Sequence, residues 1–114
     1  MTGPDLSIVI PLHDEEENIP FLVEGIRSAL GGRNWELILV DDGSRDGTLA
    51  TACRAAGADD RIRVLRLARN YGQSTALQAG FDHARGTAIV SLDGDLQNDP
   101  GEIPLLLERL EEGS

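Results

Sequence analysis

The sequence predicts an α/β fold, namely an open, mainly parallel sheet with helices on both faces, in a single domain over residues 1–114. Short runs rich in Ile, Val and Leu alternate with longer segments whose apolar residues recur at helical spacing. A chain of 114 residues with 40% apolar content can build one core. Strands separated by helices run parallel, because right-handed crossovers preserve strand direction. The usual strand order is then 3-2-1-4, with a ligand crevice at the strand carboxyl ends between the first and fourth strands.

The first elements follow from local patterns. Residues 6–10 (LSIVI) form an apolar run typical of a buried strand, and Pro11 is expected to end it. Apolar residues at helical spacing predict a helix over 19–30, closed by a pair of glycines. Residues 35–40 (WELILV) are predicted to be the second strand.

The remaining elements repeat this alternation. Residues 48–56 are predicted to be a helix that Gly57 ends. Residues 62–67 alternate between apolar and polar side chains, which indicates a strand with one wetter face near a sheet edge. The pattern continues as a helix, a strand and a helix over residues 74–84, 88–92 and 102–112.

Composition excludes several classes of protein. The chain has ten arginines, no lysine and a formal net charge of −10. P-loop NTPases, pyridoxal enzymes and protein kinases each need a lysine at their site, so they are excluded. The negative charge argues against a nucleic-acid partner, because binding phosphates needs a basic face.

Other counts bear on compartment and redox chemistry. The single cysteine, Cys53, cannot form an intramolecular disulfide and is expected to be a small buried residue. No apolar run approaches the ~18 residues of a membrane span, and the N-terminus lacks the apolar stretch of a signal peptide. The default compartment is therefore the cytoplasm.

Acidic side chains follow three of the predicted strands. They lie in residues 11–17 (PLHDEEE), 41–46 (DDGSRD) and 93–97 (DGDLQ). Because parallel strands end at the same edge of a sheet, these carboxylates are expected to crowd together and repel. A bound divalent cation or a cationic ligand would relieve the repulsion.

The segment Asp93-Gly94-Asp95 is the sharpest local feature. Two carboxylates directly after a buried strand can turn toward one cation, and Gly94 leaves room for a ligand. Oxygen donors without thiolates suit Mg²⁺ or Mn²⁺, and Gln97 can add a further oxygen. The same pattern also occurs in ordinary turns, so its position after the fourth strand is what favours a metal site.

Several residues have simpler interpretations. Glu16 and Glu17 precede a helix, where the helix dipole favours acidic residues. Asp46 is typical of a turn with a helix cap, and His13 can be a loop histidine without a role. Arg69 either balances the acidic edge or faces a phosphate or covers a donor.

The motifs resemble a known family. The runs SIVIPLHDEEENI, ELILVDDGSRDGT, LARNYGQSTALQAGFDHARG and AIVSLDGDLQNDP resemble the Rossmann-like nucleotide-binding half of family 2 glycosyltransferases of the GT-A type. Among these, they are most similar to the polyprenyl-phosphate (dolichyl- or undecaprenyl-phosphate) sugar transferases. The resemblance covers nearly the whole chain. It implies a UDP- or GDP-sugar donor, a polyprenyl phosphate acceptor and inversion at the anomeric carbon.

The resemblance also implies the site residues. The nucleotide-sugar-binding positions are Pro11, His13, Glu15, Val40, Asp42, Asp93, Gly94 and Asp95. Asp93, Asp95 and Gln97 would hold the Mg²⁺ or Mn²⁺, and Asp95 would take part in catalysis only through that metal. His13 replaces the family's more usual aromatic residue, and Gly94 replaces its more common alanine.

The family's enzymes continue well beyond this length, so the chain is expected to be their donor half, truncated before the acceptor half. The complete protein would then act at the cytoplasmic face of a membrane, whereas the fragment alone could be inactive. The open edge of the fourth strand is expected to favour self-association. Alternatives are a non-catalytic nucleotide- and metal-binding module or a nucleotidyltransferase, although the latter needs a basic loop after the first strand, where this chain is acidic.

Overall fold

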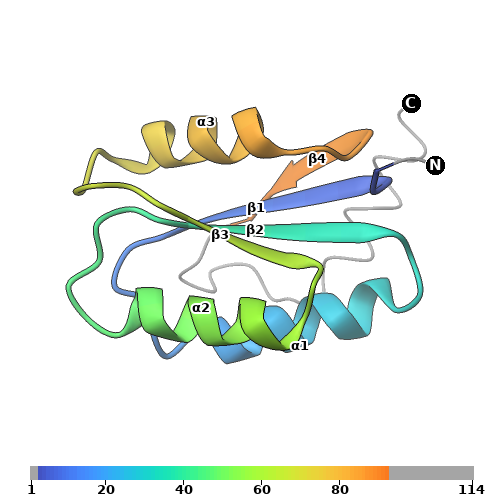
Figure 1. Ribbon diagram of the computed structural model, residues 1–114, viewed down its shortest axis with the longest axis horizontal. Helices are drawn as coiled ribbons and strands as arrows, with labels where there is room; N and C mark the ends of the chain where they lie inside the picture. Colours follow the sequence, from blue (N-terminus) through green and yellow to red (C-terminus); the bar gives the residue numbers. More distant parts are fainter. Residues whose placement is uncertain (1–2, 93–114) are drawn as a thin grey trace.

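The computed structural model describes residues 3–92 and confirms the predicted fold class and strand order. Within these residues a parallel sheet has the order β3-β2-β1-β4, with α1 and α2 on one face and α3 on the other (Figure 1). The strands are β1 (Leu6–Leu12), β2 (Trp35–Asp41), β3 (Ile62–Arg66) and β4 (Ala88–Ser91). The helices are α1 (Ile19–Leu30), α2 (Thr48–Ala58) and α3 (Gln73–His83). The helix predicted over 102–112 lies outside the described residues.

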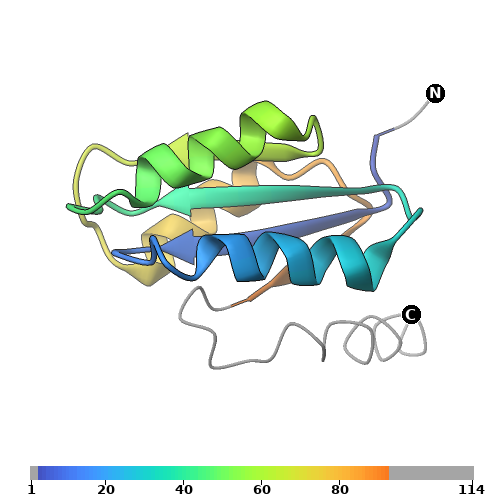
Figure 2. The same ribbon diagram turned by 90° about the horizontal axis from the view of Figure 1, so that it is seen from below.

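The core lies on both faces of the central strands β1 and β2. β3 is at the edge of the sheet, as its alternating pattern predicted. One face packs against α1 and α2, which Figure 2 shows side by side. On the other face, Val9, Ile38 and Val40 pack with Ala76 of α3. Gly80 allows α3 to approach this closely, because a Cβ there would lie 2.3 Å from a methyl carbon of Val9.

The prediction that Pro11 ends the first strand is wrong, because β1 continues to Leu12. The Val9 carbonyl accepts a hydrogen bond from the Leu92 N–H at 3.1 Å, and the Leu12 carbonyl accepts one from the Asp42 N–H at 2.8 Å. Backbone groups of successive residues point to opposite sides, so the Pro11 nitrogen faces the β4 side. The register with β4 ends at Val9, and the missing N–H therefore removes no bond to β2.

Two further predictions fail in α2. Gly57 lies inside the helix, which ends at Ala58, and Asp59 then takes an extended conformation with φ of −148°. Cys53 is exposed rather than buried, because the buried face of α2 is that of its neighbour Ala52. The remaining boundaries agree with the predicted ones within one residue.

A buried ionic cluster at the opposite end of the strands fixes the segment that leads into β4. The Glu36 carboxylate, 3% exposed, accepts hydrogen bonds from the Ser7 hydroxyl, the Arg63 guanidinium at 3.0 Å and the Arg85 N–H at 2.7 Å. The Ser7 hydroxyl also accepts one from the Gly86 N–H at 2.7 Å. Burial opposes ionisation of Glu36, but these hydrogen bonds outweigh it and hold its pKa below the usual value.

Candidate functional site

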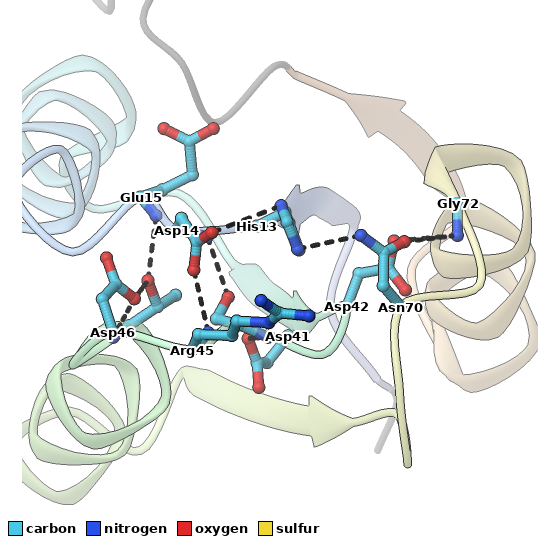
Figure 3. A network of polar contacts seen from close by, with 11 residues as sticks. His13, Asp14, Glu15, Asp41, Asp42, Arg45, Asp46, Asn70 and Gly72 are labelled. Atoms are coloured by element: carbon cyan, nitrogen blue, oxygen red, sulfur yellow. Dashed lines mark hydrogen bonds and ion pairs between the residues drawn. The ribbon is translucent and has the colours of Figure 1, made fainter.

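The loops after β1, β2 and β3 line an open cavity of about 450 Å³ at the carboxyl edge of the sheet. This volume is in the range of small-molecule sites. The cavity is lined by His13, Asp14, Asp41, Gly43, Ser44, Arg45, Leu49, Arg66, Leu67, Ala68, Arg69 and Asn70. Figure 3 shows the side chains of His13 and Asn70 directed toward each other from two of these loops. The sequence predicted a crevice between the first and fourth strands, whereas this cavity lies over β1, β2 and β3.

His13 forms a contact that joins two loops of the cavity. Its Nε2 lies 2.8 Å from the side-chain nitrogen of Asn70, in the loop between β3 and α3 (Figure 3). Its Nδ1 lies 3.7 Å from a carboxylate oxygen of Asp14. Both ring nitrogens therefore face polar groups, so the structure places His13 in the wall of the cavity.

Asp14 connects the loop after β1 with the loop after β2. Its carboxylate accepts a hydrogen bond from the Arg45 N–H at 2.8 Å, and its own N–H donates to the Ser44 hydroxyl at 2.9 Å. Asp14 has a φ of 54°, which is uncommon for a residue other than glycine. The two hydrogen bonds to the neighbouring loop hold the residue in this conformation.

Asp42 and Gly43 connect the loop after β2 with the loop after β3. The two carboxylate oxygens of Asp42 accept hydrogen bonds from the N–H groups of Tyr71 at 2.8 Å and Gly72 at 3.0 Å. Gly43, with a φ of 69°, packs so closely that an added Cβ would lie 2.3 Å from the Asn70 nitrogen. The three loops around the cavity therefore form one interlocked unit.

The cavity brings together charges of both signs. Asp41, 3% exposed, lines it, and one of its carboxylate oxygens accepts a backbone hydrogen bond at 3.2 Å. Arg45, Arg66 and Arg69 also line it, and among residues 3–92 their guanidinium groups pair with no carboxylate. Arg69 instead lies over the Tyr71 ring, 5.1 Å from its centre. These cations are available to an anionic ligand.

A second, smaller hollow of about 280 Å³ contains Glu15 and other acidic side chains. Glu15 is held there by its N–H, which donates to the Thr48 hydroxyl at 2.9 Å, and by its carboxylate, which accepts from the Asn18 amide at 2.9 Å. The Asp46 carboxylate accepts hydrogen bonds from the hydroxyl and N–H of Thr48. The hydroxyl bond is the main reason that the pKa of Asp46 is lowered. Asp46 thus forms the predicted kind of turn before α2, but the N-cap residue of that helix is Gly47, without a side-chain capping bond.

Glu16 interacts with a different helix from the one that the sequence predicted. The prediction put it at the start of the helix that follows it, but its carboxylate accepts a hydrogen bond from the Gly47 N–H at 3.1 Å, before α2. A helix dipole therefore still stabilises the Glu16 carboxylate, but it is the dipole of α2 and not that of α1.

The structure gathers only some of the predicted nucleotide-binding residues. His13 lines the larger cavity and Glu15 the smaller one, while Pro11 is half-buried in β1. The side chain of Val40 is fully buried beneath α3, so it lies in neither hollow. Asp42 is 4% exposed, and both of its oxygens accept bonds from the loop before α3.

The predicted metal ligands Asp93, Asp95 and Gln97, together with Gly94, lie outside the described residues. Within residues 3–92, no three or more His, Cys, Asp or Glu side chains are grouped so as to hold a metal ion. Over the same residues, the longest helix is α1 with 12 residues, and none is both long and apolar enough to cross a bilayer.

Of the twelve residues that line the cavity, only His13 was among the predicted site residues, and the charged residues that were missed include Asp41, Arg45 and Arg66. Position alone gave a partial signal, since Asp41 and Arg66 are the last residues of β2 and β3 and are register partners. The direction in which these two side chains point depends on how the loops pack, and this packing could not be predicted from the sequence.

The strand order and the open cavity at the carboxyl edge define a doubly wound α/β domain of the kind that GT-A glycosyltransferases use. The chain belongs to glycosyl transferase family 2, whose family model matches residues 7–114.

Two curated relatives extend this finding. The chain is 47% identical over 110 residues to a dodecaprenyl-phosphate galacturonate synthase from Rhizobium johnstonii, covering 94% of this chain and 32% of that protein. It is 47% identical over 112 residues to an undecaprenyl-phosphate 4-deoxy-4-formamido-L-arabinose transferase from Shewanella sediminis, covering 95% of this chain and 34% of that protein. The chain thus spans about a third of the length of these relatives.

A solved structure supports the fold. The chain superimposes with a TM-score of 0.74 and 29% identity on glucosyl-3-phosphoglycerate synthase from Mycobacterium tuberculosis, in a complex with Mn²⁺, UDP and glucosyl-3-phosphoglycerate. The match covers 95% of this chain and 40% of that one.

Proposed function

We propose that the complete protein transfers a sugar from a nucleoside diphosphate to a polyprenyl phosphate, and that this chain is its donor-binding part. The observation that carries the proposal is the cavity at the carboxyl edge, which His13 lines together with arginines that have no carboxylate partner among residues 3–92. The curated relatives, named as transferases that use polyprenyl phosphates, support the acceptor class. The Mycobacterium tuberculosis relative, solved with UDP and Mn²⁺, supports a nucleotide and a divalent cation.

The donor would be bound by groups of both signs. The positive charges of Arg45, Arg66 and Arg69 attract the diphosphate, which the net charge of −10 would otherwise repel. His13 and Asp41 offer polar edges to the base or ribose. Neutral apolar surface from Leu49 and its neighbours completes the cavity.

We retain the family's first positions as proposed contacts: Pro11, His13, Glu15, Val40 and Asp42. Their parts differ. Val40 would act through packing and not through contact with the donor, because its side chain is buried in the core. Asp42 would shape the loop before α3 and thereby one wall of the cavity.

Asp93, Asp95 and Gln97 would hold Mg²⁺ or Mn²⁺, because their donor atoms are all oxygens. Gly94 would leave the donor room to approach. The last described residue, Leu92, follows β4 directly, and its N–H donates to the Val9 carbonyl at 3.1 Å. When bound, the cation supplies Lewis-acid stabilisation of the leaving diphosphate.

The acceptor phosphate is ionised at neutral pH, so its oxygen needs no strong general base. That oxygen would form the new bond to the anomeric carbon as the bond to the diphosphate oxygen breaks. Attack from the face opposite the leaving group inverts the anomeric centre. Because the acceptor is a lipid, the complete protein would work at a membrane, at its cytoplasmic face.

Asp95→Asn tests the donor site in the 114-residue chain. Calorimetry with UDP- and GDP-sugars, each with Mg²⁺ or Mn²⁺, should show metal-dependent binding that this variant abolishes. Asp60→Asn is the matched control, because Asp60 is exposed next to β3 at the opposite edge of the sheet. Unchanged affinity in Asp95→Asn would reject the assignment. Incubating the complete protein with labelled donor and polyprenyl phosphate separates the alternatives, since binding without transfer would indicate a non-catalytic module.

A further inference from the structure

The contact between His13 and Asn70 is the one direct side-chain hydrogen bond described between the loop after β1 and the loop after β3. The two nitrogens lie 2.8 Å apart, within hydrogen-bond distance (Figure 3). One of them must donate and the other accept. Which does which depends on the orientation of the amide and on the protonation of the ring.

A second hydrogen bond fixes the orientation of the amide. The Asn70 side-chain oxygen accepts a hydrogen bond from the Gly72 N–H at 3.0 Å, and it shares this N–H with the Asp42 carboxylate. Turning the amide over would place its NH₂ group against that N–H, with two donors facing each other. The Asn70 NH₂ group therefore points to His13 and donates, so the His13 Nε2 must accept.

This assignment determines the state of the ring. A histidine whose Nε2 accepts is neutral and carries its proton on Nδ1. The Nδ1 of His13 faces the Asp14 carboxylate at 3.7 Å, a partner that suits an N–H donor. The two neighbours of the ring thus favour the same tautomer.

We propose that Asn70 is a positioning residue of the donor site, which holds His13 as the neutral Nδ1–H tautomer and makes donor affinity fall when His13 is protonated. The proposal rests on the proposed function, because it takes the cavity to be the place where the nucleotide binds. Protonation would turn Nε2 into a donor that faces the Asn70 NH₂ group. The loop after β3 would then lose its side-chain link to the loop after β1.

Charged groups from each neighbouring loop face the ring or share its cavity. Asp14, from the loop after β1, and Asp41, at the end of β2, favour the protonated ring. The cations oppose it: Arg45 from the loop after β2, Arg66 at the end of β3 and Arg69 from the loop after β3. These charges are of mixed sign. The hydrogen-bond donors and acceptors around Asn70 therefore decide which protonation state of His13 links the loops after β1 and β3.

The first test needs no nucleotide. Long-range proton–nitrogen NMR of the 114-residue chain distinguishes the two neutral tautomers of a histidine, and His83→Gln removes the signals of the only other histidine. At about pH 8, where histidine is ordinarily neutral, His13 should be the Nδ1–H tautomer. Asn70→Asp should shift it toward the Nε2–H form, because a carboxylate can only accept. An Nε2–H tautomer in the wild-type chain would overturn the proposal.

Asn34→Asp is the matched control for that change. Asn34 is exposed at the opposite edge of the sheet, where its amide donates to the Gly3 carbonyl. This variant should leave the His13 signals as they are in the wild-type chain. A shift equal to that of Asn70→Asp would show a general effect of charge and contradict the proposal.

The second test measures affinity for UDP-glucose and GDP-mannose with Mn²⁺ at about pH 8 and about pH 5.5, a range that spans ordinary histidine titration. From about pH 8 to about pH 5.5, the affinity of the wild-type chain should fall roughly fivefold more than the affinity of His13→Gln, because only the wild-type chain loses the hydrogen bond. Glutamine can still accept from Asn70 but does not titrate. Asn70→Asp should reverse this difference, because its carboxylate pairs with the protonated ring.

The outcomes separate the two proposals. Equal pH dependence in the wild-type chain and His13→Gln would overturn the role of Asn70. If neither nucleotide sugar binds at any pH, the donor site fails, and the tautomer measurement still decides whether Asn70 sets the state of His13.

Discussion

The carboxylate of Asp42 and the backbone N–H of Tyr71 meet at 2.8 Å, which ties the end of β2 to the loop before α3. The other oxygen of Asp42 accepts from Gly72 at 3.0 Å, where φ is 105°. A nearly buried carboxylate is thereby satisfied by two backbone amides. The geometry of one cavity wall therefore depends on a residue whose side chain does not line the cavity.

We expect Asp42→Asn to loosen this wall. Asparagine can satisfy one of the two N–H groups, but its NH₂ group would face the other as a second donor. The expected loss is about 1–3 kcal/mol in the free energy of unfolding, measured by urea denaturation. Asp82→Asn, an exposed change on α3, should cost little. Equal losses in the two variants would contradict the role assigned to Asp42.

Gly43→Ala tests the close packing of two loops. The φ of 69° disfavours any side chain, and a Cβ would lie 2.3 Å from the Asn70 nitrogen and 2.5 Å from the Arg69 carbonyl carbon. Strain and displacement together should cost more than about 2 kcal/mol in thermal or chemical unfolding. Gly32→Ala is the matched control, because a Cβ there meets nothing within 4 Å. A native-like stability of Gly43→Ala would show that the loops are not interlocked as described.

The regular elements could be predicted because burial leaves a direct mark on the sequence. The central strands contain continuous apolar runs, and the buried face of α1 recurs at helical spacing. The prediction that Pro11 ends the first strand was wrong, because whether a proline ends a strand depends on which neighbouring strand its nitrogen faces. Sheet register determines that, and it cannot be read from the local sequence. Asp41 and Arg66 were missed for a related reason, since their place in the cavity is set by strand pairing and loop packing.

The Glu36 cluster predicts a pH dependence of stability. The pKa of Glu36 is lowered in the folded chain, so its contribution is present above the pKa of the unfolded state and is lost as the pH falls through the folded pKa. Glu36→Gln should therefore cost about 1–3 kcal/mol near neutral pH, and the difference from the wild-type chain should shrink below about pH 4.

The control for this change is Glu24→Gln. Glu24 pairs with Arg27 at 3.6 Å, but its side chain is 71% exposed, and such pairs contribute little. Urea denaturation of the three chains across pH measures the effect. A difference between Glu36→Gln and the wild-type chain that grows as the pH falls would contradict a lowered pKa for Glu36 in the folded chain.

Among residues 3–92, the side of β4 that faces away from β1 has no strand partner, which predicts self-association. Among the described residues β4 pairs only with β1, and the N–H groups of Ala88 and Leu92 donate to that side, at the Asp5 and Val9 carbonyls. By alternation, the backbone groups of Ile89 face the open side, and its side chain is 42% exposed. Unpaired strand edges recruit further strands, so a second copy of the chain should associate there.

Ile89→Glu should weaken this association, because it places negative charge on the edge of a chain that already carries a net charge of −10. Phe21→Glu makes the same kind of change on α1, where Phe21 is 66% exposed, and should leave the association as it is in the wild-type chain. Sedimentation velocity over a range of concentrations measures the effect. A wild-type chain that stays monomeric at high concentration, or an equal response to both variants, would reject β4 as the surface of contact.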